Sequence, residues 1–154
     1  MSSGYLQNAA DATLTAHQSG ATASAYSNDY AKITLTTHTE RGGLSMPSGG
    51  ARWSHVELVI EDESADTGEL DHACKVFFTW DSAGDDICAG PSSSVEMVAG
   101  RGVQYRYMCA IDMDMKPVIP SDGAVDTLYM WVATIGFGDE TATLKRARLY
   151  WYTD

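Results

Sequence analysis

The side chains best suited to chemistry lie in one acidic segment, residues 61–71, which holds six carboxylates and no basic residue. Carboxylate oxygens are the hard ligands that calcium prefers. Asp62 and Asp66 alternate with Ser64, so these two aspartates are the candidates for a calcium site. The segment departs from an EF-hand loop, because Gly68 comes one place too late and no bidentate glutamate closes the loop. We therefore expect a solvated acidic loop, with a calcium site as the minority alternative.

A second group of carboxylates, Asp81, Asp85 and Asp86, surrounds Gly84. Paired carboxylates can act as general acid and base, but aspartates beside a glycine more often stabilise a turn by accepting backbone hydrogen bonds. The four histidines form neither an HxH nor an HExxH motif, and the sequence has no GxSxG motif or phosphate-binding loop. The sequence therefore predicts no enzymatic activity, no resident metal and no cofactor.

Arginine and tyrosine side chains gather in the last strand-like segment, residues 141–152. As an extended strand, this segment has one face made of Thr143, Ala147, Leu149 and Trp151. Its other face carries Leu144, Arg146, Arg148, Tyr150 and Tyr152. Arginine and tyrosine are enriched in protein interfaces, and the isolated tyrosines near the N-terminus suit the same role. The predicted interface therefore comprises Tyr5, Tyr26, Tyr30, Arg146, Arg148, Tyr150 and Tyr152.

The four tryptophans offer a different chemistry, since sugar rings stack on flat aromatic faces. Trp80, Trp131 and Trp151 fall on faces that we expect to point inward, so the expected role of most of them is core packing. A carbohydrate platform that includes Trp53 is the alternative.

The overall charge restricts the class of partner. The formal net charge is −11, from 21 acidic and 10 basic side chains. Nucleic-acid binding and binding to anionic membranes both need clustered basic residues, so we expect neither partner. No apolar run approaches the ~20 residues needed to span a bilayer, and the first residues do not read as a secretory signal. The three cysteines match no zinc pattern and are expected to stay reduced.

Strand patterns and turn clusters define the expected architecture. Alternating or apolar strand patterns cover residues 31–37, 53–60, 73–80, 95–98, 103–111, 127–135 and 141–152. Residues 1–30 show no sustained period, and we predict an extended or flexible N-terminal arm before a single β-sandwich domain at 31–154. The predicted fold is an all-β, antiparallel β-sandwich. A jelly roll is favoured over an immunoglobulin-like fold, because long loops separate the strands.

The chain resembles the small jelly-roll virion structural proteins of tailed bacteriophages, of the head decoration or cement type. The resemblance rests on a Ser/Thr/Ala-rich arm before one β domain and on three segments, residues 78–92, 128–132 and 144–151. Residues 78–86 read FTWDSAGDD and lead into AGPS at residues 89–92. Residues 128–132 read LYMWV, and residues 144–151 read LKRARLYW.

The resemblance implies a non-enzymatic protein that stabilises the capsid through inter-subunit contacts. Its expected partners are the major capsid protein and copies of itself in a homotrimer, within a virion assembled in the host cytoplasm. The alternative function is carbohydrate binding, either as a lectin-like module or as a tail receptor-binding component.

Overall fold

The structure is a computed structural model that describes residues 2–15, 31–37, 44–62, 72–98, 100, 102–111, 117–120, 123–137 and 140–154. Within these residues all regular secondary structure is β, which confirms the predicted fold class. The strands are β1 (Ser3–Asn8), β2 (Ala12–Leu14), β3 (Ala31–Thr37), β4 (Arg52–Asp62), β5 (His72–Thr79), β6 (Ile87–Ala89), β7 (Val95–Met97), β8 (Gln104–Ala110), β9 (Thr127–Ile135) and β10 (Ala142–Tyr152). A helix long and apolar enough to cross a membrane is not found in the described ranges.

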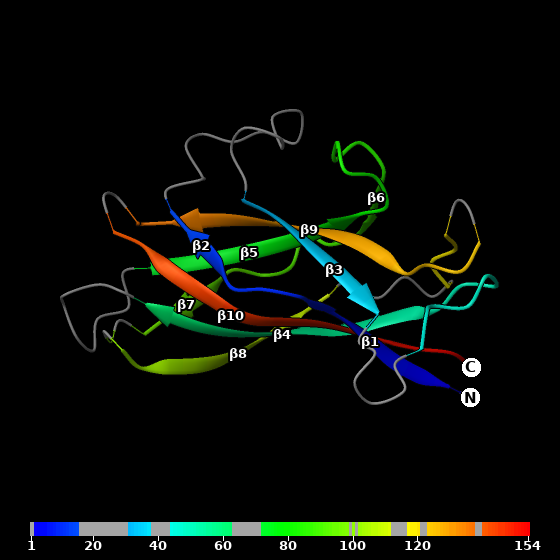
Figure 1. Cartoon of the computed structure of the whole chain (residues 1–154), viewed down its shortest axis with the longest axis horizontal. Coiled ribbons are helices and arrows are strands. Elements are labelled where there is room, and N and C mark those ends of the chain that lie inside the picture. Colours follow the sequence, from blue (N-terminus) through cyan, green and yellow to red (C-terminus); the bar gives the residue numbers. More distant parts are fainter. Residues whose placement is uncertain are drawn as a thin grey trace.

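The described strands form one continuous antiparallel sheet in the order β6-β5-β9-β3-β1-β10-β4-β8. In addition, β2 pairs with β10 and β7 pairs with β5. The sheet curls so that the half containing β5, β9 and β3 faces the half containing β10, β4 and β8 (Figure 1). The halves are therefore not two separate sheets, because β1 pairs with β3 on one side and with β10 on the other.

Two strands lie within the segment predicted as an N-terminal arm. β1 and β2 are short and partly polar, and the sequence pattern did not predict them. In the structure, Leu6 on β1 is completely buried. The Asn8 side chain accepts a hydrogen bond from the backbone N–H of Ala147 at 2.7 Å. Residues 3–14 are therefore part of the sheet, while residues 16–30, including Tyr26 and Tyr30, lie outside the described residues.

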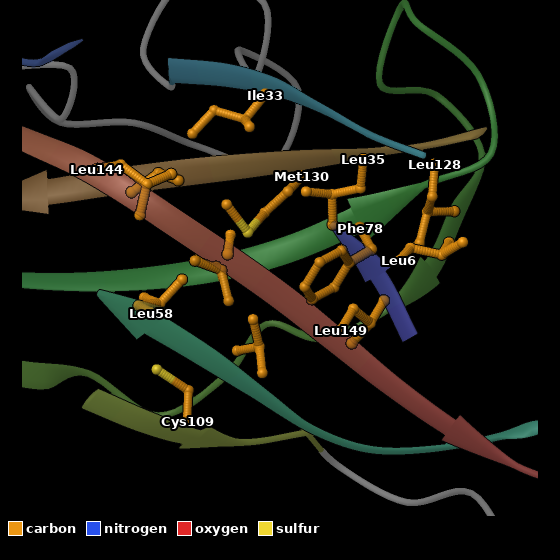
Figure 2. Packing of buried hydrophobic residues seen from close by; sticks show 14 of the residues in the cluster. Leu6, Ile33, Leu35, Leu58, Phe78, Cys109, Leu128, Met130, Leu144 and Leu149 are labelled. Atoms are coloured by element: carbon orange, nitrogen blue, oxygen red, sulfur yellow. The ribbon is translucent and has the colours of Figure 1, made fainter. Parts of the chain in front are cut away.

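The main core fills the space inside the curl. Phe78 on β5, Leu6 on β1 and Leu149 on β10 meet there and are fully buried (Figure 2). Each of these strands contributes its inward side chains to the same cluster, as the period of two requires.

A β-bulge changes which side chains of β10 point into the core. The register against β4 shifts between Leu144 and Arg146. As a result Leu144 is fully buried on the same side as Ala147 and Leu149, whereas strict alternation had placed Leu144 on the outer face. Thr143, which alternation had placed inward, is only partly buried. A bulge inserts one residue and so reverses the parity of a strand, which periodicity alone cannot reveal.

A second, smaller apolar contact lies on the outer face of β5 and β9. Trp131 and Phe77 lie opposite each other there with stacked rings, 6.1 Å between centroids, and both are at most 3% exposed. A Cβ on Gly84 would lie 3.0 Å from the Trp131 ring, so the turn after β5 covers this ring closely. Trp131 is thus buried as expected, but by an outer turn rather than in the main core.

Candidate functional site

The outer surface of β1, β10 and β4 carries a row of aromatic side chains. Tyr5 and Tyr150 are direct cross-strand partners, and their ring centroids lie 5.5 Å apart. His55 on β4 stacks on the other side of Tyr150, with centroids 4.6 Å apart and an interplanar angle of 19°. Cross-strand aromatic pairs of this kind stabilise a sheet and fix the orientation of the rings.

Two arginines border this aromatic row. The Arg148 guanidinium lies 4.5 Å from the centroid of the Tyr5 ring, and its Nε donates a hydrogen bond to Gln7 Oε1 at 2.7 Å. The Arg146 Nη2 donates to the carboxylate of Glu57. Cation–π and charge-assisted contacts hold both side chains in place, so little conformational entropy remains to be lost when a partner binds.

A hollow of about 400 Å³ opens beside these rings. Its lining residues are Ser3, Gly4, Tyr5, Ser54, His55, Tyr150, Trp151 and Tyr152. Trp151 is 2% exposed, and its Nε1–H has no hydrogen-bond partner among the described residues. We call the surface formed by Tyr5, His55, Arg146, Arg148, Tyr150 and Tyr152 the Tyr-Arg face.

The Tyr-Arg face unites residues that are far apart in the sequence. Of the predicted interface residues, Tyr5, Arg146, Arg148, Tyr150 and Tyr152 lie together on it. Sequence reasoning missed His55 and Glu57, although both occupy outward positions in the alternating pattern of residues 53–60. Only the pairing of β4 with β10 makes these two residues neighbours of the arginines and tyrosines.

The candidate calcium ligand Asp62 has a different partner in the structure. Asp62 is 1% exposed and contacts His72 Nδ1 at 2.5 Å, while Glu140 contacts His72 Nε2 at 2.7 Å. Each ring nitrogen of His72 thus contacts a carboxylate oxygen of the same chain. Both ring nitrogens are occupied, so His72 is not placed to accept a proton from a nucleophile. Asp66 lies outside the described residues.

In the part of the chain that the structure describes, His, Cys, Asp and Glu side chains form no group of three or more that could hold a metal ion.

The aspartates around Gly84 build a turn. The Asp81 carboxylate accepts hydrogen bonds from the backbone N–H groups of Ala83, Asp85 and Asp86, at 3.1, 3.2 and 2.7 Å. Burial alone would raise the pKa of Asp81, but these backbone donors hold its pKa below the usual value. Asp81 therefore acts as the predicted turn stabiliser.

All three cysteines are free thiols, as expected. Burial raises the pKa of Cys74 to about 12 and that of Cys109 to about 11. Burial also raises the pKa of Cys88. The thiolate is the reactive form, so these pKa values describe inert side chains at neutral pH.

No protein-family profile and no curated protein matches this chain. Among solved structures, the chain is similar to the infectious bursal disease virus Gt strain structure, with 10% identity and a TM-score of 0.46 over 97% of this chain and 31% of that one. It is also similar to the xylan-binding module CBM15, with 11% identity and a TM-score of 0.43 over 98% of this chain and 92% of the module.

A third similar structure is a carbohydrate-binding module specific for non-crystalline cellulose, with 8% identity and a TM-score of 0.44 over 90% of this chain and 70% of that one. The chain spans about a third of the viral chain that it matches. The similar structures thus include a virus and carbohydrate-binding modules, and similarity at this level does not favour either function.

Proposed function

We propose that this protein is a non-enzymatic structural subunit that assembles with other proteins through the Tyr-Arg face. Within that class, we propose a virion structural protein, most specifically a bacteriophage capsid decoration or cement protein that forms a homotrimer and contacts the major capsid protein. The observation that carries the assembly proposal is the gathering of Tyr5, Tyr150 and Arg148 on one outer surface. The assignment to a virion rests on the sequence resemblance.

The composition and order of the Tyr-Arg face support an assembly role. Tyrosine and arginine are enriched among the residues that dominate binding energy at interfaces, and such residues usually sit in or beside a pocket. Tyr5, Tyr150 and Arg148 are all partly exposed, so a partner can reach them. Their mutual contacts fix their positions before a partner arrives, which reduces the entropic cost of association.

The charge distribution supports the same role. Arg52, Arg106, Arg146 and Arg148 are four of the ten Lys and Arg residues, and all four lie on β4, β8 or β10. Copies of a chain with net charge −11 repel one another unless basic side chains meet acidic ones. Arg52 is ion-paired with Asp154, and Arg106 and Arg146 are ion-paired with Glu57. Among the described residues, Arg148 is therefore the one of these four without an ion pair, and it offers its charge to an acidic partner.

Light scattering on the purified full chain tests the assembly proposal. We expect a trimer for the wild type, and a shift toward monomer for Tyr150→Ala and Arg148→Ala. Loss of an interface residue of this kind costs about 2 kcal/mol or more, which is a weakening of roughly 30-fold. Lys75→Ala is the matched control, because Lys75 is a partly exposed basic residue on β5, in the other half of the sheet, and does not line the hollow. We expect this control to assemble like the wild type.

A monomeric wild type at all concentrations tested would overturn self-assembly through the Tyr-Arg face. Mass spectrometry of purified particles, with cross-linking, tests the virion assignment separately. We expect cross-links between lysines of this protein and a capsid subunit. Absence of the protein from particles would overturn the virion proposal.

Carbohydrate binding remains the alternative function, and it would use a different part of the molecule. Trp53, Trp131 and Trp151 are at most 3% exposed, so these tryptophans cannot form a binding platform. Trp80 is partly exposed and lines a separate hollow together with Tyr129. This hollow is the observation that favours the alternative.

A further inference from the structure

A hollow of about 470 Å³ lies between the turn that follows β5 and the segment that leads into β9. The lining residues that matter for its chemistry are Trp80, Asp81, Asp86, Asp126, Thr127 and Tyr129. Its volume falls within the range of about 300–1,000 Å³ that is typical of small-molecule sites. The hollow is distinct from the Tyr-Arg face, since the two share no lining residue.

The first wall of the hollow, the turn at residues 80–86, is fixed by its own hydrogen bonds. Three backbone N–H groups of the turn donate to the Asp81 carboxylate. The backbone N–H of Trp80 donates a hydrogen bond to the backbone carbonyl of Asp86 at 3.0 Å, and Gly84 packs against the Trp131 ring. These contacts hold Trp80 and Asp86 in position without a ligand.

The second wall, the segment that leads into β9, is held by contacts with other segments of the chain. Val125 exchanges backbone hydrogen bonds with Met46, at 3.1 and 3.2 Å. The Asp126 carboxylate accepts a hydrogen bond from the Ser45 hydroxyl. Tyr129 is set by the pairing of β9 with β3 and β5. Both walls are therefore ordered in advance, which lowers the entropic cost of binding a small molecule.

We propose that this hollow binds a neutral sugar residue of a glycan. The apolar C–H faces of a pyranose ring pack on aromatic rings, and Trp80 and Tyr129 provide such rings. The carboxylates of Asp86 and Asp126 accept hydrogen bonds from sugar hydroxyls, and the hydroxyl of Thr127 can donate or accept. The lining is mainly polar and includes two aromatic residues, and this combination can orient a polyhydroxylated ligand.

A cationic ligand fits the hollow less well than a neutral one, although the lining is acidic. The Lys32 ammonium group lies 5.9 Å from the centroid of the Tyr129 ring and 5.8 Å from that of Trp131. It also donates a hydrogen bond to the carbonyl of Ser82, in the first wall, at 3.1 Å. The chain thus holds its own cation over the Tyr129 ring and against the first wall, where it would repel a second cation bound on that ring.

This inference gives a site to the alternative function and does not depend on the Tyr-Arg face. The test is a printed glycan array probed with the full chain. Titration with soluble hexasaccharides of glucose, xylose, mannose and N-acetylglucosamine follows, monitored by tryptophan fluorescence. We expect saturable binding of at least one glycan, unchanged by EDTA and by Tyr150→Ala.

Two variants locate the binding. Trp80→Ala and Asp86→Ala should each weaken the affinity by about tenfold or more, because each removes a direct ligand contact. Trp80 also packs against the core and lies 6.1 Å from Trp53, centroid to centroid, so the exposed Asp86 is the variant that leaves the fold intact. Asp85→Ala is the matched control, because Asp85 is exposed in the same turn but does not line the hollow.

Three outcomes would overturn the proposal. The first is no binding to any array glycan or hexasaccharide at millimolar concentration. The second is equal affinity for Asp86→Ala and Asp85→Ala. The third is binding of a lysine-rich peptide in place of glycans, which would assign the hollow to cations.

Discussion

The close approach of Gly4 to Trp151 gives the sharpest test of how β1 is held in the sheet. Gly4 and Trp151 are cross-strand partners of β1 and β10. A Cβ added at Gly4 would lie 2.6 Å from Cζ2 and 2.9 Å from Cε2 of the indole. Trp151 is 2% exposed, so Gly4→Ala forces either the buried indole or the β1 backbone to move.

The magnitude follows from comparison with a second glycine. A Cβ at Gly49 would meet no atom within 4 Å, so Gly49→Ala makes the same chemical change without a clash. The two variants then differ mainly by the cost of overpacking at Gly4, which is about 1–3 kcal/mol. For a chain of this length, that cost lowers Tm by roughly 2–12 °C relative to Gly49→Ala.

Urea unfolding followed by circular dichroism, with calorimetry for Tm, measures this difference. We expect Gly4→Ala also to weaken self-assembly more than Gly49→Ala does, because Gly4 and Trp151 both line the hollow of the Tyr-Arg face. Equal free energies of unfolding for the two variants, within about 0.5 kcal/mol, would refute the close packing of β1 against Trp151.

Three further predictions concern buried and turn groups. His72→Gln should destabilise the fold by about 1–3 kcal/mol in urea unfolding, because it removes the ring nitrogens that the buried Asp62 and the partly exposed Glu140 contact, whereas Glu140→Gln should cost less. The lowered pKa of Asp81 means that its contribution to stability is present above the ordinary value of 3.8 and is lost as the pH falls through the folded-state pKa. Asp81→Ala should therefore cost stability at pH 7, and the cost should shrink progressively as the pH falls below 3.8. Cys74 and Cys109 should react with a thiol reagent at pH 8 only after unfolding, and rapid labelling of the native protein would contradict their burial.

The strands that could be predicted are those with a strong pattern of their own. The predicted runs at 31–37, 53–60, 73–80, 95–98, 103–111, 127–135 and 141–152 match β3, β4, β5, β7, β8, β9 and β10. β1 and β2 could not be found in this way, because their stability comes from pairing with β10 and β3 rather than from local composition. Segments with such low intrinsic β-propensity become strands only when a partner strand is already in place.

The sequence indicated which residue types form the candidate site, but it did not identify all of the residues that form it. Composition and parity indicated Arg146, Arg148 and Tyr150 as an outward set. His55 and Gln7 join them only through cross-strand pairing, which no single-sequence pattern specifies. The hollow beside Trp80 was missed altogether, because its two walls are more than 30 residues apart in the chain.

By itself, the sequence determined the all-β class, the reduced cysteines, the turn at Asp81 and the chemical character of the last strand. Each of these depends on short-range regularities: side-chain period, turn chemistry and spacing. Tertiary structure alone decided that Leu144 points inward, that Tyr5 lies against Tyr150, and that β1 connects the two halves of the sheet. A bulge and a strand register depend on the partner strand, and a partner strand exists only once the chain has folded.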